Sequence, residues 1–402
     1  MIKEHYEKVI VGCCFAFAFV NIGLASTAFS VHQPYIVAME GIGDTGGSLI
    51  LSARTLTSLL AMLVVDRYYD LLDARRGVFL ACLFTMGGFL IYSMAHTLPV
   101  FIAGAVVLGA GYGFGGLVAM TMLANRWFDA GVGGALGFAT MGSGVASIVV
   151  PLVVVRIIEA SSLSAAFLFE GAMALVVGLA VFALLRNRPS DLGMKPYEGK
   201  PGKRRSRGIR QMRPSSAGER ALLLVAMAFV GLYCCGGMTY MSVLATSSGY
   251  DAVFAATLVS IAGIALTVAK FATGELFDFM GVPRASAVMF VLGAVGFLAC
   301  CFAGLGEMTL MVVGAVLVGI GLSLGSVGIS VWSIETSDPA MRSRHIKNVQ
   351  VAYGLGGFLA NTLPGIVKDL VGTYVVSYAA MLVVLVAAAV IVLRYYRIYS
   401  KA

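Results

Sequence analysis

Long apolar runs alternate with short polar stretches along almost the whole chain. A helix that crosses a membrane needs about 20 mainly apolar residues, and twelve runs reach or approach that length. We expect membrane-spanning helices near residues 9–31, 47–65, 77–94, 99–123, 135–155, 164–185, 220–245, 252–274, 286–303, 308–333, 349–367 and 375–393. No clear small-residue cleavage pattern ends the first run, so we expect it to be a span and not a signal peptide. The pattern predicts an all-α polytopic membrane protein with twelve transmembrane helices.

Composition and charge agree with a chain that lies mostly in lipid. Hydrophobic residues make up 59% and charged residues 12% of the sequence, whereas soluble domains contain about 25% charged residues. Loops rich in lysine and arginine face the cytoplasm. With both termini inside, the cytoplasmic segments contain Lys3, Lys8, Arg67, Arg75, Arg76, Arg126, Arg284, Arg342, Arg344, Lys347, Arg394, Arg397, Lys401 and the cluster from Arg186 to Arg220. The outer loops then contain only Arg156 and Lys368.

This asymmetry predicts a multi-pass protein of the inner (plasma) membrane with both termini in the cytoplasm. It also accounts for the net charge of +8, so no nucleic-acid partner is expected.

The cysteines and histidines do not indicate a metal centre or a disulfide framework. All seven cysteines lie inside predicted spans, and neither a Cys-x-x-Cys motif nor a Cys/His ligand spacing occurs. No metal and no cofactor is expected. A membrane-embedded enzyme would need a nucleophile with a base, or clustered metal ligands, and neither is present, so no catalytic residue is expected. A receptor of this build would be expected to add a signalling domain, whereas the chain ends at Lys401 and Ala402.

Several motifs occur twice, with offsets between 208 and 213 residues. The matched pairs are Asp70 with Asp278, Arg76 with Arg284, Gly109 with Gly319, Gly111 with Gly321, Gly115 with Gly325, Gly144 with Gly357 and Pro151 with Pro364. Two homologous six-helix halves, related by an axis along the membrane normal, explain all of them. We expect bundles at residues 1–185 and 220–402. The glycine stripes lie deep within spans, where close helix packing explains them.

Residues 186–219 are expected to form a cytoplasmic linker. The stretch is rich in Arg, Lys, Gly, Pro and Ser, a composition typical of flexible linkers. Its basic residues can rest on anionic lipid headgroups, so membrane lipid is an expected partner.

Two cations fall within predicted spans. Lys270 lies eight residues before Asp278, which places it about 12 Å inside the apolar region. Ionisable residues at such depth usually face a cavity and not lipid. Arg54 lies seven residues after Gly47, about 10 Å from the outer edge, where the side chain can snorkel outward or serve as a gate that attracts anions. Glu170 is the one clear intramembrane acid, and it lies toward the outer side of its span, where it is a poor partner for Lys270.

Two motifs resemble known sequences. The repeated loop is similar to the signature loop of the major facilitator superfamily, in which a glycine, an acid and a base bracket a tight turn. The second copy, GELFDFMGVPR, keeps Gly274, Asp278, Gly281 and Arg284, whereas the first has Asp66 and Asp73 where glycines are usual. The segment ANRWFDAGVGGALGFATMGSG at 124–144 resembles the oxalate/formate antiporter and monocarboxylate transporter branch, and RNRPSDLGMKPYEG from Arg186 resembles the start of that branch's central loop.

The resemblance implies a role for Lys270. That branch carries a cation, more often arginine, at this position of span eight, where it pairs with a substrate carboxylate. Lysine offers a point charge and not a bidentate fork. The acid that proton-linked members carry one turn earlier is Leu266 here, and the second cation of oxalate exchangers is Tyr353. These departures favour a monovalent anion over a dicarboxylate, and uniport or exchange over a proton symport built on that acid.

Further candidate substrate-binding residues are polar side chains placed near mid-membrane. They are Tyr353 and Gln350 in span eleven, Asn21 in span one, Tyr112 in span four, Tyr240 in span seven and Thr140 in span five. Each has a structural alternative, since buried tyrosines and amides usually bond within the protein. Asp70, Arg76, Asp278 and Arg284 are candidates for a conformational latch, with plain solvated loop charge as the alternative.

We therefore expect a monomeric secondary active or facilitative transporter of a small organic anion that works by alternating access. Aromatic acids, keto acids, lactate-like acids, oxalate and formate all remain open as substrates. A counter-transported anion or a proton is a further candidate partner. The main alternative is a drug or other solute/proton antiporter of the same fold, which would typically use an intramembrane acid.

Overall fold

The computed structural model describes residues 6–129, 132–197, 216–337 and 342–399, and at 132–134 and 342–344 the backbone alone. Within these ranges every regular element is a helix, apart from one isolated β-bridge between Phe128 and Tyr197. In lipid a chain must satisfy its own backbone hydrogen bonds, and a helix does so within each segment. The prediction of an all-α protein is confirmed.

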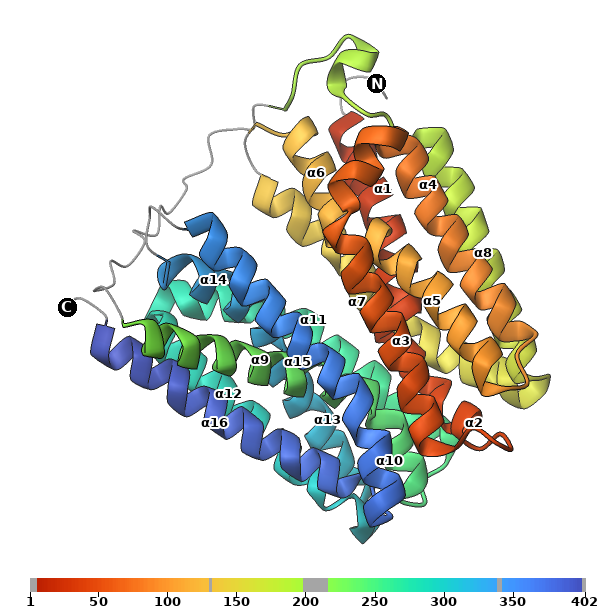
Figure 1. Cartoon of the computed structure of the whole chain (residues 1–402), viewed down its shortest axis with the longest axis vertical. Coiled ribbons are helices and arrows are strands. Elements are labelled where there is room, and N and C mark those ends of the chain that lie inside the picture. The colour runs from red at the N-terminus through yellow and green to blue at the C-terminus, as the bar shows by residue number, and fades with distance from the viewer. Residues whose placement is uncertain (1–5, 130–131, 198–215, 338–341, 400–402) are drawn as a thin grey trace. The chain divides into compact units, whose positions relative to one another are not determined.

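Contacts between Cα atoms divide the chain into two compact units, Met1–Arg204 and Arg205–Ala402. In Figure 1 the first unit runs from red to green and the second from green to blue. The first unit contains α1 (Tyr6–Ala18), the π-helix η2 (Phe19–Thr27), η3 (Phe29–Val31), α2 (Gln33–Val37), α3 (Gly43–Leu63), α4 (Val65–Ser93), α5 (Leu98–Gly115), α6 (Leu117–Trp127), α7 (Val132–Ala160), α8 (Leu163–Leu184) and η4 (Pro189–Leu192). Within it α4 packs against α5 and α8, α3 against α5, and α1 with η2 against α7.

The second unit repeats this arrangement with its own helices. It contains α9 (Ala217–Thr239), α10 (Met241–Ser247), α11 (Ala252–Met280), α12 (Val282–Cys301), η5 (Ala303–Leu305), α13 (Met308–Leu322), η6 (Ser323–Gly325), α14 (Val327–Glu335), α15 (Arg342–Val371) and α16 (Val375–Tyr399). Here α12 packs against α13 and α16, α11 against α13, and α9 against α15.

Eleven segments of the described chain are long and apolar enough to cross a membrane. The twelfth predicted span corresponds to α15, which is long enough at 30 residues but carries charged residues at both ends. Most helices extend beyond the predicted apolar limits, because backbone hydrogen bonding continues where side chains become polar. The predicted span at 220–245 is wrong in detail, since it divides at Tyr240 into α9 and α10.

Corresponding breaks interrupt the fourth and tenth spans. Between α5 and α6, Gly116 has φ −90° and ψ −146°, which no α-helix contains. Between α13 and α14 the chain passes through the 3₁₀ turn η6. The breaks fall next to Gly115 and Gly325, which the sequence repeat paired.

The glycine stripes allow backbones to approach closely, as expected. A Cβ atom on Gly109 would clash with the carbonyl oxygen of Arg54, and one on Gly319 would clash with that of Ala262. The two contacts occupy matching places in the two units, so the sequence repeat is also a repeat of packing.

The start of the predicted linker is fixed against the first unit. Trp127 Nε1 donates to the carbonyl of Arg186 at 3.2 Å. The backbone of Tyr197 pairs with that of Trp127 and Asp129 at 2.8 and 3.1 Å. The expectation of flexibility is therefore wrong for residues 186–197, because aromatic side chains and backbone hydrogen bonds hold them to the end of α6. Residues 198–215 of the linker lie outside the described chain.

Candidate functional site

Lys270 lies on α11 at the edge of the stripe by which this helix packs. Ala269, Thr273 and Phe277 of that stripe are buried, whereas Lys270 is half-buried. Among the described residues no side chain or carbonyl forms a hydrogen bond or ion pair with its ammonium group. A cation in this setting keeps its full capacity to bind an anion.

Polar groups from the break in span ten lie beside the helix that carries Lys270. Thr273, one turn further along α11, has its Oγ1 2.8 Å from Oγ of Ser323 in η6, and both side chains are buried. Residues three apart on a helix are neighbours. Thr273 and Ser323 therefore form a buried pair of hydroxyl groups at an interruption of the neighbouring helix, one turn along α11 from Lys270.

Tyr353 reaches the same break from α15. A Cβ atom on Gly325 would lie 2.9 Å from Tyr353 Oη and 2.8 Å from Cys234 Sγ. Cys235 Sγ lies 3.8 Å from the same hydroxyl. The second unit thus brings the helices of Lys270 and Tyr353, two of the predicted substrate-binding residues, to one short segment, Ser323–Gly325. Gln350 lies one turn before Tyr353 on α15 and is exposed.

The amide group of Asn21 has all its hydrogen-bond partners within the first unit. Its Nδ2 lies 3.4 Å from the carbonyl of Gly115 and 3.6 Å from Cys82 Sγ, and its Oδ1 accepts from Thr85 at 2.7 Å. The side chain is 0% exposed. Asn21 therefore stabilises the break in span four, where a carbonyl lacks a helical donor, and both of its amide N–H groups are engaged away from any ligand.

Arg54 turns into the bundle instead of snorkelling toward water. Its side chain is buried, Nη1 donates to the carbonyl of Ala25 at 2.7 Å, and Cζ lies 5.4 Å from the centre of the Phe29 ring. A carbonyl in the π-helical segment and an aromatic face give the guanidinium partners that lipid does not offer. The expected extension to the outer mouth is wrong for this reason.

The other polar candidates have partners in the protein or are only partly accessible. Tyr240 is buried and its Oη donates to the carbonyl of Asn361 at 2.7 Å. Thr140 is half-buried and bonds back to the carbonyl of Gly137 at 2.9 Å. Tyr112 is half-buried near the end of α5.

The charged residues of the repeated loop are exposed. Asp70, Arg76 and Arg284 form no side-chain hydrogen bond or ion pair with the described residues, and Asp278 is also exposed. The contacts of the first loop come from Asp73 and Arg75, which sequence reasoning did not select. Asp73 Oδ1 accepts from the Arg76 N–H at 3.0 Å, and Arg75 Nε donates to the carbonyl of Phe182 at 2.6 Å.

A second site that sequence reasoning missed lies in the first unit. His32 and Glu170 meet there with 2.9 Å between Nε2 and Oε2, and both side chains are 0% exposed. Nothing in the sequence spacing joins them, because they come from the end of span one and from span six. The depth of Glu170 was the one available signal.

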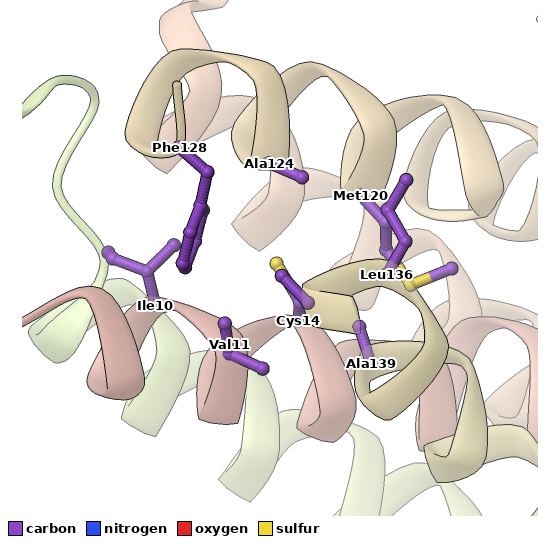
Figure 2. Close-up of a pocket in the computed structure, with 9 residues that line it drawn as sticks. Ile10, Val11, Cys14, Met120, Ala124, Phe128, Leu136 and Ala139 are labelled. Carbon is purple, nitrogen blue, oxygen red and sulfur yellow. The ribbon is translucent and has the colours of Figure 1, made fainter. Parts of the chain in front are cut away.

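A small apolar cavity lies between α1, α6 and α7, and Figure 2 shows the residues that line it. Ile10 and Cys14 come from α1, Ala124 from α6 and Ala139 from α7. Its lining side chains are apolar apart from the Cys14 thiol, so an anion finds no partner there. Chemistry therefore places the candidate site at Lys270 and not in this cavity.

Comparison with known proteins gives the family relationship. The family model described as Major Facilitator Superfamily matches residues 11–306. No curated protein matches the sequence significantly. A mutant of the nucleoside transporter NupG has a TM-score of 0.75 at 12% identity, over 97% of this chain and 99% of that chain.

Two further solved structures agree. The D-xylose-proton symporter has a TM-score of 0.72 at 13% identity, over 96% of each chain. A bacterial homologue of the human lysosomal transporter Spinster, inward-facing and unoccupied, has a TM-score of 0.69 at 14% identity, over 98% of this chain and 97% of that chain. Structural similarity at such low sequence identity establishes the fold alone, and the predicted twelve-helix architecture is confirmed.

Proposed function

The chain belongs to the major facilitator superfamily, and on that premise we propose that this transporter carries a small monocarboxylate anion across the membrane, with Lys270 binding the carboxylate. The two six-helix halves, residues 1–185 and 220–402, would expose the site alternately to each side. Residues 186–219 would connect them in the cytoplasm, where both termini lie.

One observation carries the proposal. Lys270 is a half-buried cation within α11 and has no acidic or polar partner among the described residues. A charge inside the membrane costs several kcal/mol unless it is neutralised or hydrated. A bound carboxylate would remove that cost when the two halves close over the site, so occupancy and closure would favour each other.

The groups around Lys270 support a monovalent anion. Leu266, one turn earlier, is half-buried and apolar, and Tyr353 stands where a second cation would favour a dicarboxylate. The hydroxyls of Thr273 and Ser323 bind each other at 2.8 Å. A single ammonium and a tyrosine hydroxyl suit one carboxylate group better than two.

The exposed charges of the repeated loops suit the proposed latch. Asp70 and Arg76 flank the turn at Asp73 in α4, and Arg284 lies in the first turn of α12. All three are exposed, so they can form and break contacts during rocking of the halves. Single exposed pairs contribute only about 0–1 kcal/mol, which is a suitable size for a reversible contact.

The direct test is anion flux in proteoliposomes. Lys270→Gln should lower carboxylate uptake by about tenfold or more, since a hydrogen bond to a charged group contributes about 1.5–3 kcal/mol. Lys347→Gln is the matched control, because Lys347 is an exposed lysine of the same unit, and it should transport as the wild type does. Undiminished flux in Lys270→Gln would contradict the proposal.

A ligand panel identifies the substrate class. Formate, lactate, pyruvate, benzoate and oxalate, together with cationic drugs, should be screened for thermal stabilisation of the purified protein, since a ligand that prefers the folded form raises its stability. A monocarboxylate should stabilise the wild type and not Lys270→Gln. Stabilisation by cationic drugs alone would favour the solute/proton antiporter instead.

A further inference from the structure

An imidazole and a carboxyl group meet inside the first unit, whereas Lys270 belongs to the second unit. His32 follows η3, and Glu170 lies on α8, seven residues after its first residue, or about 10 Å into the helix. Nε2 of His32 is 2.9 Å from Oε2 of Glu170, and neither side chain has any exposed surface. The proposed anion site uses neither residue.

The partner of the other imidazole nitrogen fixes the tautomer. Nδ1 of His32 lies 3.2 Å from the carbonyl oxygen of Phe29. A carbonyl can only accept, so Nδ1 carries a proton and Nε2 of a neutral ring presents a lone pair. That lone pair would face a carboxylate oxygen, and two acceptors at 2.9 Å repel each other.

One proton between the two groups removes the repulsion. The pair is then either an imidazolium with a carboxylate or an imidazole with a carboxylic acid, and the two groups share one proton. Without that proton the pair itself would carry a buried negative charge. The geometry therefore indicates a site for one proton.

Charged and titratable groups also occur on the helices around the pair. On α3, Arg54 lies over the Phe29 ring, which in turn contacts the His32 ring at a centroid distance of 5.0 Å. On α4 the Tyr92 hydroxyl is buried without a hydrogen bond in the described chain. Burial raises the pKa of Tyr35 on α2, and the charge of Glu159 on α7 raises it further. Glu159 and Arg156 are exposed.

The pair is not built as a structural ion pair would be. Buried ion pairs add little stability unless further hydrogen bonds satisfy the carboxylate. Here the contact of Nε2 with Oε2 lacks the alignment of a hydrogen bond, and within the described chain both oxygens of Glu170 have no other partner. The two groups are close together and fully buried, but they do not form an aligned hydrogen bond with each other.

In the second unit tyrosines stand at the positions that correspond to His32 and Glu170, so these positions do not require charged groups. In the helices corresponding to span one and span six, Tyr240 donates to the carbonyl of Asn361 and Tyr378 to that of Gly237, each at 2.7 Å. These tyrosines fill the space with satisfied hydroxyls. Since packing can be achieved in this way, a titratable pair in the first unit needs another explanation.

The backbone before His32 is irregular. Span one changes from α1 to the π-helix η2 and then to the 3₁₀ turn η3 just before His32. Such irregular helical segments often occur at functional sites. A change of helical register in this segment would move His32 relative to α8 and admit water to the pair.

We infer that His32 and Glu170 form the proton-binding site of a proton-coupled transport cycle. Loading transfers a proton from hydronium to the pair and leaves water, and release is the reverse, with no other bond changed. Intramembrane ionisable residues commonly mark such proton pathways. The inference rests on the transporter fold and does not depend on which substrate Lys270 binds.

The first experiment detects the proton directly in the purified full-length protein, with no substrate added. Infrared difference spectra between alkaline and acidic buffer should show a carboxyl or imidazole band that is absent in both Glu170→Gln and His32→Gln. Glu307→Gln, which removes an exposed acid of the second unit, should keep the band. Identical difference spectra in the wild type and in both pair variants would overturn the inference.

The second experiment measures coupling. In proteoliposomes Glu170→Gln, which resembles a permanently protonated carboxyl group, should retain exchange of the transported solute at equal pH and lose accumulation driven by a pH gradient. Accumulation equal to that of the wild type would overturn the inference. If no carboxylate in the panel stabilises the purified protein, the proposed anion specificity is refuted. The infrared result then still decides whether His32 and Glu170 bind the proton.

Discussion

Asp73 and Gly281 hold the same unusual backbone conformation at matching positions of the two units. Asp73 has φ 58° and ψ 171°, and Gly281 has φ 82° and ψ 156°. This region of conformational space is open to glycine and strained for other residues by about 1–3 kcal/mol. The chain therefore turns in the same way after spans two and eight, once with a glycine and once with a strained aspartate.

Substitutions at these two positions should change stability in opposite directions. Asp73→Gly should raise the free energy of unfolding by about 1 kcal/mol, because the relief of strain exceeds the few tenths lost with the N-cap. Gly281→Ala should lower it by about 1–3 kcal/mol. Thermal unfolding of the purified protein in detergent measures both effects.

Gly274→Ala is the matched control for Gly281→Ala. A Cβ atom at either glycine would meet no atom within 4 Å, so neither substitution causes a clash. Gly274 has ordinary helical geometry within α11, where alanine is favoured over glycine by about 0.5–1 kcal/mol. A similar loss of stability in both variants would contradict a backbone origin.

Asn21 should affect stability more than substrate binding. Asn21→Ala removes the partner of the Gly115 carbonyl and leaves the Thr85 hydroxyl with only its 3.3 Å contact to the carbonyl of Ala81, and an unsatisfied buried group costs about 1–3 kcal/mol. We expect a lower unfolding temperature with nearly unchanged apparent affinity for the transported solute. Thermal unfolding and concentration-dependent uptake separate the two quantities.

A double-mutant cycle with Thr85 tests this contact. Thr85→Val removes the donor to Asn21 Oδ1, and the coupling energy between the two substitutions should be about 0.5–3 kcal/mol. Additive effects would show that the 2.7 Å contact contributes little.

Hydropathy and the internal repeat were sufficient to predict the architecture. The twelve spans follow from the free energy of placing apolar side chains in lipid, which the sequence reports directly. The helix ends do not follow from it, because a helix can continue into polar surroundings. For the same reason the segment between the predicted spans 47–65 and 77–94 is mostly helical, with a non-helical backbone only at Asp73 within α4.

The candidate site was predicted only in part, because a sequence gives depth and not direction. The isolation of Lys270 could be expected, since a lone cation in an apolar helix has no partner on its own helix. Arg54 and Asn21 could not be placed, because their partners lie on other helices and include the carbonyls of Ala25 and Gly115 at helix irregularities. The pairing of His32 with Glu170 is a tertiary contact that no sequence period encodes.

The aromatic end of α6 should control the ordering of residues 186–197. Trp127→Phe removes the hydrogen bond from Nε1 to the carbonyl of Arg186 and keeps most of the ring packing. We expect faster amide hydrogen exchange at Tyr197 and Asp129, and faster tryptic cleavage of the bond between Arg186 and Asn187. Exchange and cleavage can both be followed by mass spectrometry.

Trp332→Phe controls for the loss of an indole hydrogen bond. Trp332 Nε1 lies 3.1 Å from Ser286 Oγ in the second unit, so its replacement should lower stability slightly and leave cleavage after Arg186 unchanged. Equal cleavage in the two variants would show that the effect comes from general loosening of the fold.

His345 should make the folded protein less stable in acid. Its Nε2 lies 2.9 Å from the Thr336 hydroxyl at the end of α14. Burial lowers the pKa of His345 below its ordinary value of 6.5, and the charge of Arg220 lowers it further. As the pH falls through 6.5, the unfolded chain binds a proton at this residue before the folded chain does, so unfolding is favoured.

His345→Gln should therefore reduce the loss of unfolding temperature between about pH 8 and about pH 5. The exposed His96 supplies the control, because His96→Gln removes an imidazole that has no hydrogen-bond or ion-pair partner among the described residues. Its unfolding temperature should follow that of the wild type across the range. If His345→Gln also follows the wild type, the burial of His345 does not limit stability in acid, and the other groups that titrate over this range must account for the loss.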